Sequence, residues 1–457
     1  MPPPGVCVNI MAARHKKSGY GSLACPERFL NQDYEQLKNF HLIRSARYID
    51  KMFPPDIISI GQGILSPDRL AKVIVPNPCF TVDGVSRFDF YQGEVGNCWF
   101  LASIGALTFQ KDILQQVVPL QQTFDQDYCG LFHFRFWRFG RWMDVVIDDK
   151  LPTIDGKLIF VHSRTPNEFW PALLEKAYAK VCGSYADMNA GTPSEALVDF
   201  TGGVHMSIDL SKAPSNLWQL MFSAAQSKSL MGCGTPQGVS VHTPLQTTHT
   251  VMSHGNIVSL VRLLNPWGQK EWKRDWSDLM SIEDFCNFFR DLDICSLSPS
   301  FLDGNSSCRW RASLQDGRWV ASITAGGCLN DPDSFWINPQ YRVKVVDSHD
   351  ECAEKQEGVS FLVSLMQKPD KRNRRLVTNL YIGFYIFEYK RRHRKFPASF
   401  FKTHMPVVKP EFYKNAREVM KFTKLKPGEY LIVPSTHKPN ETASFILSIL
   451  STAEIHV

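Results

Sequence analysis

The chain has 457 residues, of which 44% are hydrophobic and 21% are charged, and its formal net charge at pH 7 is +6. This length predicts about two to four folded units, and the composition excludes a chain that is mostly disordered. The small net charge gives no electrostatic case for nucleic-acid binding.

Several features favour the cytoplasm. The twelve cysteines show neither CxxC pairs nor a regular framework, which is typical of reduced thiols. The N-terminal stretch has no apolar core of signal-peptide length, and no apolar run is long enough to cross a membrane. We therefore predict a cytoplasmic protein in which residues 1–30, rich in Pro, Gly and Lys, form a flexible leader.

The segment 31–190 mixes helical and strand patterns. In GNCWFLASIGAL the apolar residues recur at helical spacing, so a buried helix begins close to Cys98. The run FHFRFWRFGRWMDVVIDDKLP alternates large apolar and polar residues on both sides of Phe139 and Gly140, which predicts two strands and a turn. A second helix is predicted in FWPALLEKAYAKVCGSY.

A glycine-rich break near Gly191 opens a second segment, residues 191–290, where Ile257–Leu264 predict a buried strand stopped by Pro266. The two segments together predict an α+β core of two subdomains with a cleft between them. From 291 to 457, short apolar runs bounded by Pro, Gly, Asn or Asp predict an antiparallel β-sandwich.

The segment QGEVGNCW carries candidate chemistry for a thiol nucleophile. A cysteine in the first turn of a helix feels the partial positive charge of the helix N-terminus, which favours the thiolate. Cys98 has that position, and the upstream Gln92 side chain could donate to a developing oxyanion. Farther along, Asn265 could orient a histidine and Trp267 could shield the pair from water. The alternative for a lone cysteine before an apolar helix is a small buried hydrophobe.

These segments resemble the calpain family, in the papain-like clan of cysteine proteases. The motifs that carry the resemblance are QGEVGNCWFLASIGALT, EFWPALLEKAYAK, ALVDFTGGV, NPWG followed by EW and WSD, DICSLSP, SFWINPQYRV and KPGEYLIVPST. The resemblance implies a protease core of two subdomains followed by a C2-like β-sandwich. It also implies that Cys98 is the nucleophile, Gln92 the oxyanion donor, Asn265 the orienting amide and Trp267 the shielding indole.

Calpains hold calcium in each core subdomain, and the resemblance implies ligands for both ions. Oxygen donors of this kind suit a hard cation. The first set comprises the backbone carbonyls of Val82 and Gly84 with the carboxylates of Asp89 and Glu168, and the second set comprises Glu271 and Asp278. The acidic loop of the Asp-Gly-Glu type expected after the second set is missing, so we expect that site to be weak or absent.

The histidine motif of the family, Gly-His-Ala-Tyr, is also missing. The histidines upstream of NPWG are His242, His249 and His254. If residues 253–256 form a hairpin turn, antiparallel pairing sets His249 opposite roughly Arg262, which is too far from Asn265 for a hydrogen bond without a bulge or longer loop. His249 is the first candidate because its context can form a strand, His242 is the second, and the role could also be unfilled.

The function and partners predicted from these features remain open at several points. No EF-hand loop is present up to Val457, so no small regulatory subunit is expected as a partner. The basic run at 390–395 could contact phospholipid, or it could be a solvated loop. We expect a calcium-dependent endopeptidase that makes limited cuts in proteins, with a catalytically impaired scaffold as the alternative and a lipid-binding module as a third, weaker reading.

Overall fold

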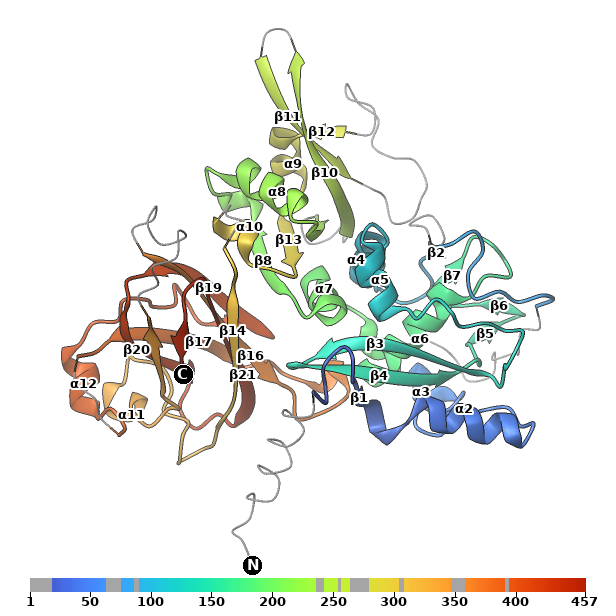
Figure 1. Cartoon of the computed structure of the whole chain (residues 1–457), viewed down its shortest axis with the longest axis horizontal. Helices are drawn as coiled ribbons and strands as arrows, with labels where there is room; N and C mark the ends of the chain where they lie inside the picture. The colour runs from blue at the N-terminus through green and yellow to red at the C-terminus, as the bar shows by residue number, and fades with distance from the viewer. Residues whose placement is uncertain are drawn as a thin grey trace, which may run out of the picture. The chain divides into compact units, whose positions relative to one another are not determined.

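The computed structural model describes residues 19–62, 75–85, 90–235, 242–253, 256–263, 279–303, 308–346, 358–390 and 394–457. The chain divides into two compact units (Figure 1). The first contains the residues up to Leu297 together with Arg372–Arg375, and the second contains Ser298–Lys371 and Leu376–Val457. The predicted sandwich boundary at residue 291 lies at the start of β13 (Asp291–Ser296), just before this division.

The N-terminal part of the first unit is built around two buried helices. α4 (Cys98–Leu107) and α6 (Trp170–Cys182) are the predicted helices, and β3 (Leu131–Arg138) pairs antiparallel with β4 (Arg141–Asp148) as predicted. The two residues that connect these strands both have positive φ, which makes the tight turn. The other elements of this part are β1 (Glu27–Arg28), α2 (Tyr34–Ile43), α3 (Ile57–Ile60), β2 (Phe90–Tyr91), α5 (Lys111–Val117), β5 (Thr153–Ile154), β6 (Lys157–Leu158), β7 (His162–Ser163) and α7 (Pro193–Thr201).

Helix α4 is buried along its whole length because almost all of its residues are apolar. The Phe100 ring lies 4.7 Å from the ring of Tyr178 on α6 and 5.9 Å from that of Phe200 on α7, measured between centroids. The ring of Phe136 on β3 closes the cluster at 5.3 Å from Tyr178. Interiors packed in this way resist displacement, so the helix that begins at Cys98 has a fixed position.

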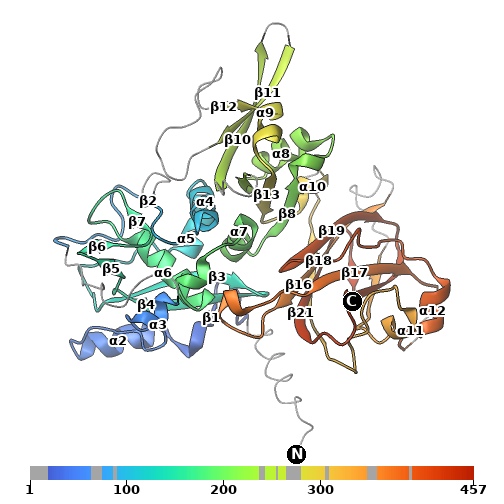
Figure 2. The same cartoon turned by 180° about the vertical axis from the view of Figure 1, so that it is seen from behind.

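The C-terminal part of the first unit is a six-stranded sheet in the order β12-β11-β10-β9-β13-β8. A hairpin of β10 and β11 projects from it (Figures 1 and 2), and the predicted strand 257–264 is observed as β11. The elements are β8 (Val204–Asp209), α8 (Leu217–Gln226), β9 (Leu230–Gly234), β10 (His242–Ser253), β11 (Asn256–Leu263), β12 (Leu279–Ser281), α9 (Ile282–Phe288) and β13.

The second unit confirms the predicted antiparallel sandwich. One sheet has the order β14-β21-β16-β19 and the other β18-β17-β20-β15-β22. Apolar side chains of both sheets, among them Trp319, Phe361, Ile432 and Phe445, form one core. The elements are α10 (Ser300–Asp303), β14 (Arg311–Trp319), α11 (Pro332–Phe335), β15 (Tyr341–Val345), β16 (Val359–Lys368), β17 (Tyr381–Glu388), α12 (Ala398–Thr403), β18 (Lys414–Asn415), β19 (Glu418–Leu425), β20 (Gly428–Thr436), β21 (Ala443–Ser451) and β22 (Ile455–His456).

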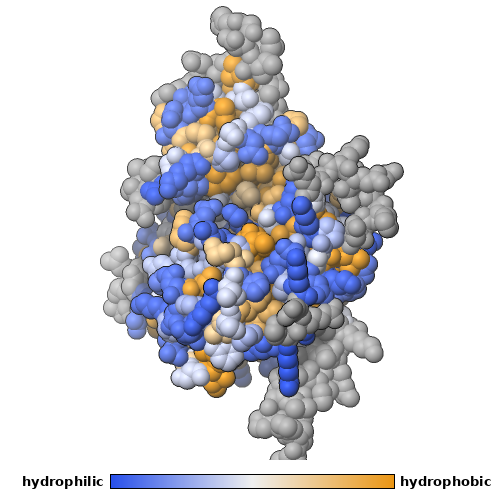
Figure 3. All heavy atoms as spheres, turned by 90° about the vertical axis from the view of Figure 1, so that its left-hand side faces the viewer, coloured by the Kyte–Doolittle hydropathy of each residue, from blue (hydrophilic) through white to orange (hydrophobic). Residues whose placement is uncertain are grey.

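Arg311, Asp316 and Arg318 of β14 are exposed, and the face in Figure 3 mixes hydrophilic areas with smaller apolar ones. One sequence prediction fails in this unit. Cys308 is disulfide-bonded, so the expectation of reduced thiols throughout is wrong at that residue, whereas nine other cysteines of the described part of the chain are free.

Candidate active site

Cys98 is the first residue of α4, as the sequence predicts. The backbone N–H groups of Phe100 and Leu101 donate to the carbonyl of Asn97 at 2.9 and 3.2 Å, so the helical hydrogen bonds begin at the residue before the cysteine. The sulfur therefore lies in the first turn, where the partial positive charge of the helix N-terminus favours a thiolate. The Cys98 residue is 7% exposed, so little of it contacts solvent.

The loop before Cys98 is held tightly against residues 159–161. The Gln92 side-chain amide donates to the Val95 carbonyl at 2.9 Å, and the Glu94 backbone N–H donates to the Ile159 carbonyl at 2.9 Å. A Cβ at Gly93 would lie 2.3 Å from that same carbonyl oxygen, so only glycine fits there. Gln92, the predicted oxyanion donor, is thus anchored on the rigid turn that carries the nucleophile.

Sequence reasoning missed a buried acid beneath this turn. Glu175 on α6 is 1% exposed, and its carboxyl accepts a hydrogen bond from Asn97 Nδ2 at 2.5 Å and one from the Val161 backbone N–H at 2.8 Å. Burial raises the pKa of Glu175 to about 8, against the opposing effect of these two hydrogen bonds. A glutamate inside the apolar run ALLEKAYAK was the available signal.

Trp99, the residue after the nucleophile, is fixed from two sides. Its indole N–H donates to the Met188 carbonyl at 3.0 Å, and the guanidinium of Arg374 lies 5.2 Å from its ring centroid. Arg374 also donates twice to Glu195 Oε2, at 2.6 and 2.9 Å, and once to the Ala190 carbonyl. Although Arg374 follows β16 in the sequence, it belongs to the first compact unit.

The strand that carries the candidate histidines packs against α4, since both β9 and β10 contact this helix. The hairpin turn is confirmed, with Ser253 opposite Asn256, but the predicted pairing of His249 with Arg262 is wrong: His249 lies opposite Leu260. A connection of two residues fixes this register. His242 lies at the other end of β10, where it pairs with Gly234 of β9.

The predicted ligands of the first calcium site come together in part. Glu168 is 2% exposed, and its two carboxylate oxygens accept hydrogen bonds from the Val82 backbone N–H at 2.7 Å and the Ser163 hydroxyl at 2.6 Å. Gly84 has a φ of 88°, so the chain turns sharply beside Val82. The Glu168 carboxylate oxygens are ligands of the type that a hard cation prefers. Within the described ranges, no three His, Cys, Asp or Glu residues gather as a metal site.

The other predicted site residues fall outside the described residues. They are Asp89, His254, Asn265, Trp267, Glu271 and Asp278.

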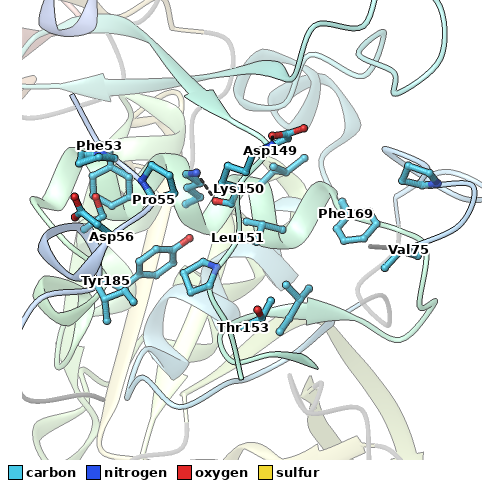
Figure 4. Close-up of a pocket in the computed structure, with 18 of the residues that line it drawn as sticks. Phe53, Pro55, Asp56, Val75, Asp149, Lys150, Leu151, Thr153, Phe169 and Tyr185 are labelled. Carbon is cyan, nitrogen blue, oxygen red and sulfur yellow. Dashed lines mark hydrogen bonds and ion pairs between the residues drawn. The ribbon is translucent and has the colours of Figure 1, made fainter. Parts of the chain in front are cut away.

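A cavity of about 590 Å³ lies in the N-terminal part of the first unit, away from the nucleophile (Figure 4). Its lining includes Phe53, Asp149, Leu151, Phe169 and Tyr185, whereas neither Cys98 nor Gln92 contributes to it. A substrate bound in this cavity would therefore not meet Cys98.

Comparison with known proteins gives the family. The family model described as calpain family cysteine protease matches residues 48–281, and that for domain III of the calpain large subunit matches residues 315–450. The chain is 38% identical to the calpain-1 catalytic subunit of Rattus norvegicus and 39% identical to that of Mus musculus, over 98% of this chain and 70% of each relative. It is 36% identical to the calpain-2 catalytic subunit of Bos taurus, over 98% of this chain and 72% of that protein. In the described part of the chain, none of the helices has both the length and the apolarity to cross a membrane. The chain belongs to the calpain family of cysteine proteases.

Proposed function

We propose that this chain is a cysteine endopeptidase that makes limited cuts in cytoplasmic proteins through an acyl-enzyme on Cys98. The observation that carries the proposal is a cysteine in the first turn of a buried helix that packs against the histidine-bearing strand β10. The Cys98 sulfur attacks the scissile carbonyl carbon, and Gln92 donates to the oxyanion that forms. The amine leaves with a proton from the histidine, and water then hydrolyses the thioester.

Two histidines compete for the proton-transfer role. His249 is the first sequence candidate, but its partner Leu260 is five residues before Asn265 rather than the expected three. His242 lies at the end of β10 that pairs with β9, and β9 also contacts α4. The register therefore favours His242. Casein cleavage by His242→Ala and His249→Ala decides between them, and retention of full activity by both variants would reject both assignments.

Calcium dependence is the second part of the proposal. Val82, Gly84, Asp89 and Glu168 would hold one ion in the first subdomain, and Glu271 with Asp278 would contribute to a second, weaker site. A bound ion would supply a positive charge beside the buried Glu168 carboxylate, which already holds the loop at Val82 through the Val82 N–H. Glu168→Gln should raise the calcium concentration needed for the change in tryptophan fluorescence. A fluorescence signal that stays flat up to millimolar calcium would remove this part.

The decisive experiment is iodoacetamide labelling at pH 7, with and without calcium, of the wild type, Cys98→Ala and the control Cys182→Ala. Rapid labelling that needs calcium and disappears only in Cys98→Ala supports an activated thiolate. Labelling of Cys98 no faster than that of a free thiol would instead support the catalytically silent scaffold.

Phospholipid contact through the sandwich is a separate proposal. Arg391 and Arg392 of the basic run lie outside the described residues, and Lys395 donates to the Ile337 carbonyl at 3.0 Å. Sedimentation with anionic vesicles in the presence of calcium tests it.

A further inference from the structure

The carboxyl group of Glu175 joins the nucleophile turn to the segment on which that turn packs. Its Oε1 accepts from Asn97 Nδ2 and its Oε2 accepts from the Val161 backbone N–H. Asn97 has no exposed surface and directly precedes Cys98. A single side chain on α6 thus determines where the turn lies relative to residues 159–161.

The polar groups around Glu175 point to an uncharged acid. No basic side chain of the described residues pairs with Glu175, and Asn97 Oδ1 is buried without a hydrogen-bond partner in the described part of the molecule. A neutral carboxyl has one O–H donor, and side-chain amide oxygen and nitrogen atoms exchange places by a 180° rotation. With the amide rotated, the Glu175 O–H donates to Asn97 Oδ1 while Val161 still donates to the other oxygen. In either orientation of the amide, the neutral acid shares one hydrogen bond with Asn97.

We propose that Glu175 is a positioning residue for Cys98, acting through Asn97 to fix the turn that presents the sulfur. The inference rests on the proposed function, since it concerns the reactivity of that sulfur. The neutral acid has a second consequence, because it places no negative charge one residue from the thiolate. Among the described titratable groups, the Tyr185 phenol has its pKa raised in part by Glu175, while Asp148 and Lys176 form an ion pair with each other.

The pH dependence follows from geometry and burial together. Because burial raises the pKa of Glu175 to about 8, the acid is neutral at pH 7 and ionises as the pH rises through about 8. The carboxylate still accepts from Asn97 Nδ2, but its negative charge, held against the residue that precedes Cys98, opposes the thiolate. The reactivity of Cys98 should therefore fall above pH 8, although an ordinary thiol becomes more reactive there.

Alkylation of Cys98 by iodoacetamide, followed by mass spectrometry of its peptide from pH 5.5 to 9.5 with calcium present, tests the proposal. Glu175→Gln keeps a neutral hydrogen-bonding group, so it should react within about twofold of the wild type at pH 7 and lose the decline above pH 8. Glu175→Leu removes both hydrogen bonds and should react about tenfold more slowly or worse, since small misplacements of reacting groups are costly. The controls are Asp293→Asn and Asp293→Leu, at a buried carboxyl on β13, and they should follow the wild type.

A Glu175→Leu protein that labels at the wild-type rate would overturn the inference, and so would a Glu175→Gln protein that keeps the decline above pH 8. If Glu175→Leu does not fold, judged by circular dichroism, the pH profile of Glu175→Gln decides alone. Wild-type Cys98 that reacts no faster than a free thiol at every pH would remove the proposed function itself. Rapid wild-type labelling with no effect of either Glu175 variant removes only the positioning role.

Discussion

Replacing Arg374 with alanine should loosen α7 and the start of α4 without disturbing the β-sandwich. The side chain makes two charge-assisted hydrogen bonds to Glu195, one bond to the Ala190 carbonyl and a contact with the Trp99 ring. Such hydrogen bonds contribute about 1.5–3 kcal/mol and a partly exposed cation–π contact about 0.5–1 kcal/mol. The Arg374 and Glu195 side chains are 27% and 19% exposed, which reduces the sum, so we expect a loss of about 2–3 kcal/mol.

A chain of several units does not unfold in a single step, so the assay must be local. Hydrogen exchange of amides in α7 and near Trp99 gives the free energy of local opening. Arg374→Lys should recover about half of the loss, because an ammonium cannot make both bonds to Glu195 or stack on the indole in the same way. The control Lys421→Ala removes an exposed ion pair with Glu411 and should change stability by about 0.5 kcal/mol or less. Exchange near Trp99 that Arg374→Ala leaves unchanged would refute the reasoning.

Three further predictions concern the first unit. Asp50→Ala leaves Lys180 buried without its ion-pair partner at 2.6 Å, so hydrogen exchange of the α6 amides at pH 7 should show a loss of about 3–5 kcal/mol in the free energy of local opening. The loss should shrink as pH rises through 8, because burial lowers the pKa of Lys180 to about 8. Gly93→Ala forces a Cβ against the Ile159 carbonyl, so the alkylation rate of Cys98 should fall about tenfold. The sandwich should keep its hydrogen-exchange protection. An unchanged alkylation rate would contradict this prediction. Burial raises the pKa of Cys182 to about 12, so under conditions that label the nucleophile its peptide should stay unmodified.

The features that the sequence predicted well depend on local patterns. The helix at Cys98 follows from apolar residues at helical spacing, and the β3–β4 pair from alternation on both sides of a turn. By contrast, glycine at residue 93 has a tertiary reason, the close approach of the Ile159 carbonyl, which no local pattern reveals.

The features that the sequence did not predict depend on pairing between distant segments. Glu175 and Asn97 are 78 residues apart, and Arg374 and Glu195 are 179 residues apart, so no local pattern reveals either contact. The predicted pairing register of the strand that carries His249 was wrong for a different reason. Its hairpin was predicted, but the register sets His249 opposite Leu260, and a shift of two residues moves a candidate base by about 7 Å along the strand.

Helix α6 carries the buried carboxyl of Glu175 and the buried amines of Lys176 and Lys180, which hold different parts of the chain, and the responses of Glu175 and Lys180 to pH oppose each other. Lys176 and Lys180 pair with Asp148 and Asp50, whereas Glu175 has no cationic partner among the described residues. Because the folded state holds the Glu175 proton more tightly than the unfolded chain does, the stability due to Glu175 is complete at low pH and lost as pH rises to about 8. The folded state binds the Lys180 proton less tightly than the unfolded chain does, so the contribution of Lys180 to the free energy of unfolding rises above pH 8. Alkaline pH should therefore weaken the turn before Cys98 while the rest of the helix keeps its place, which confines the effect to the nucleophile.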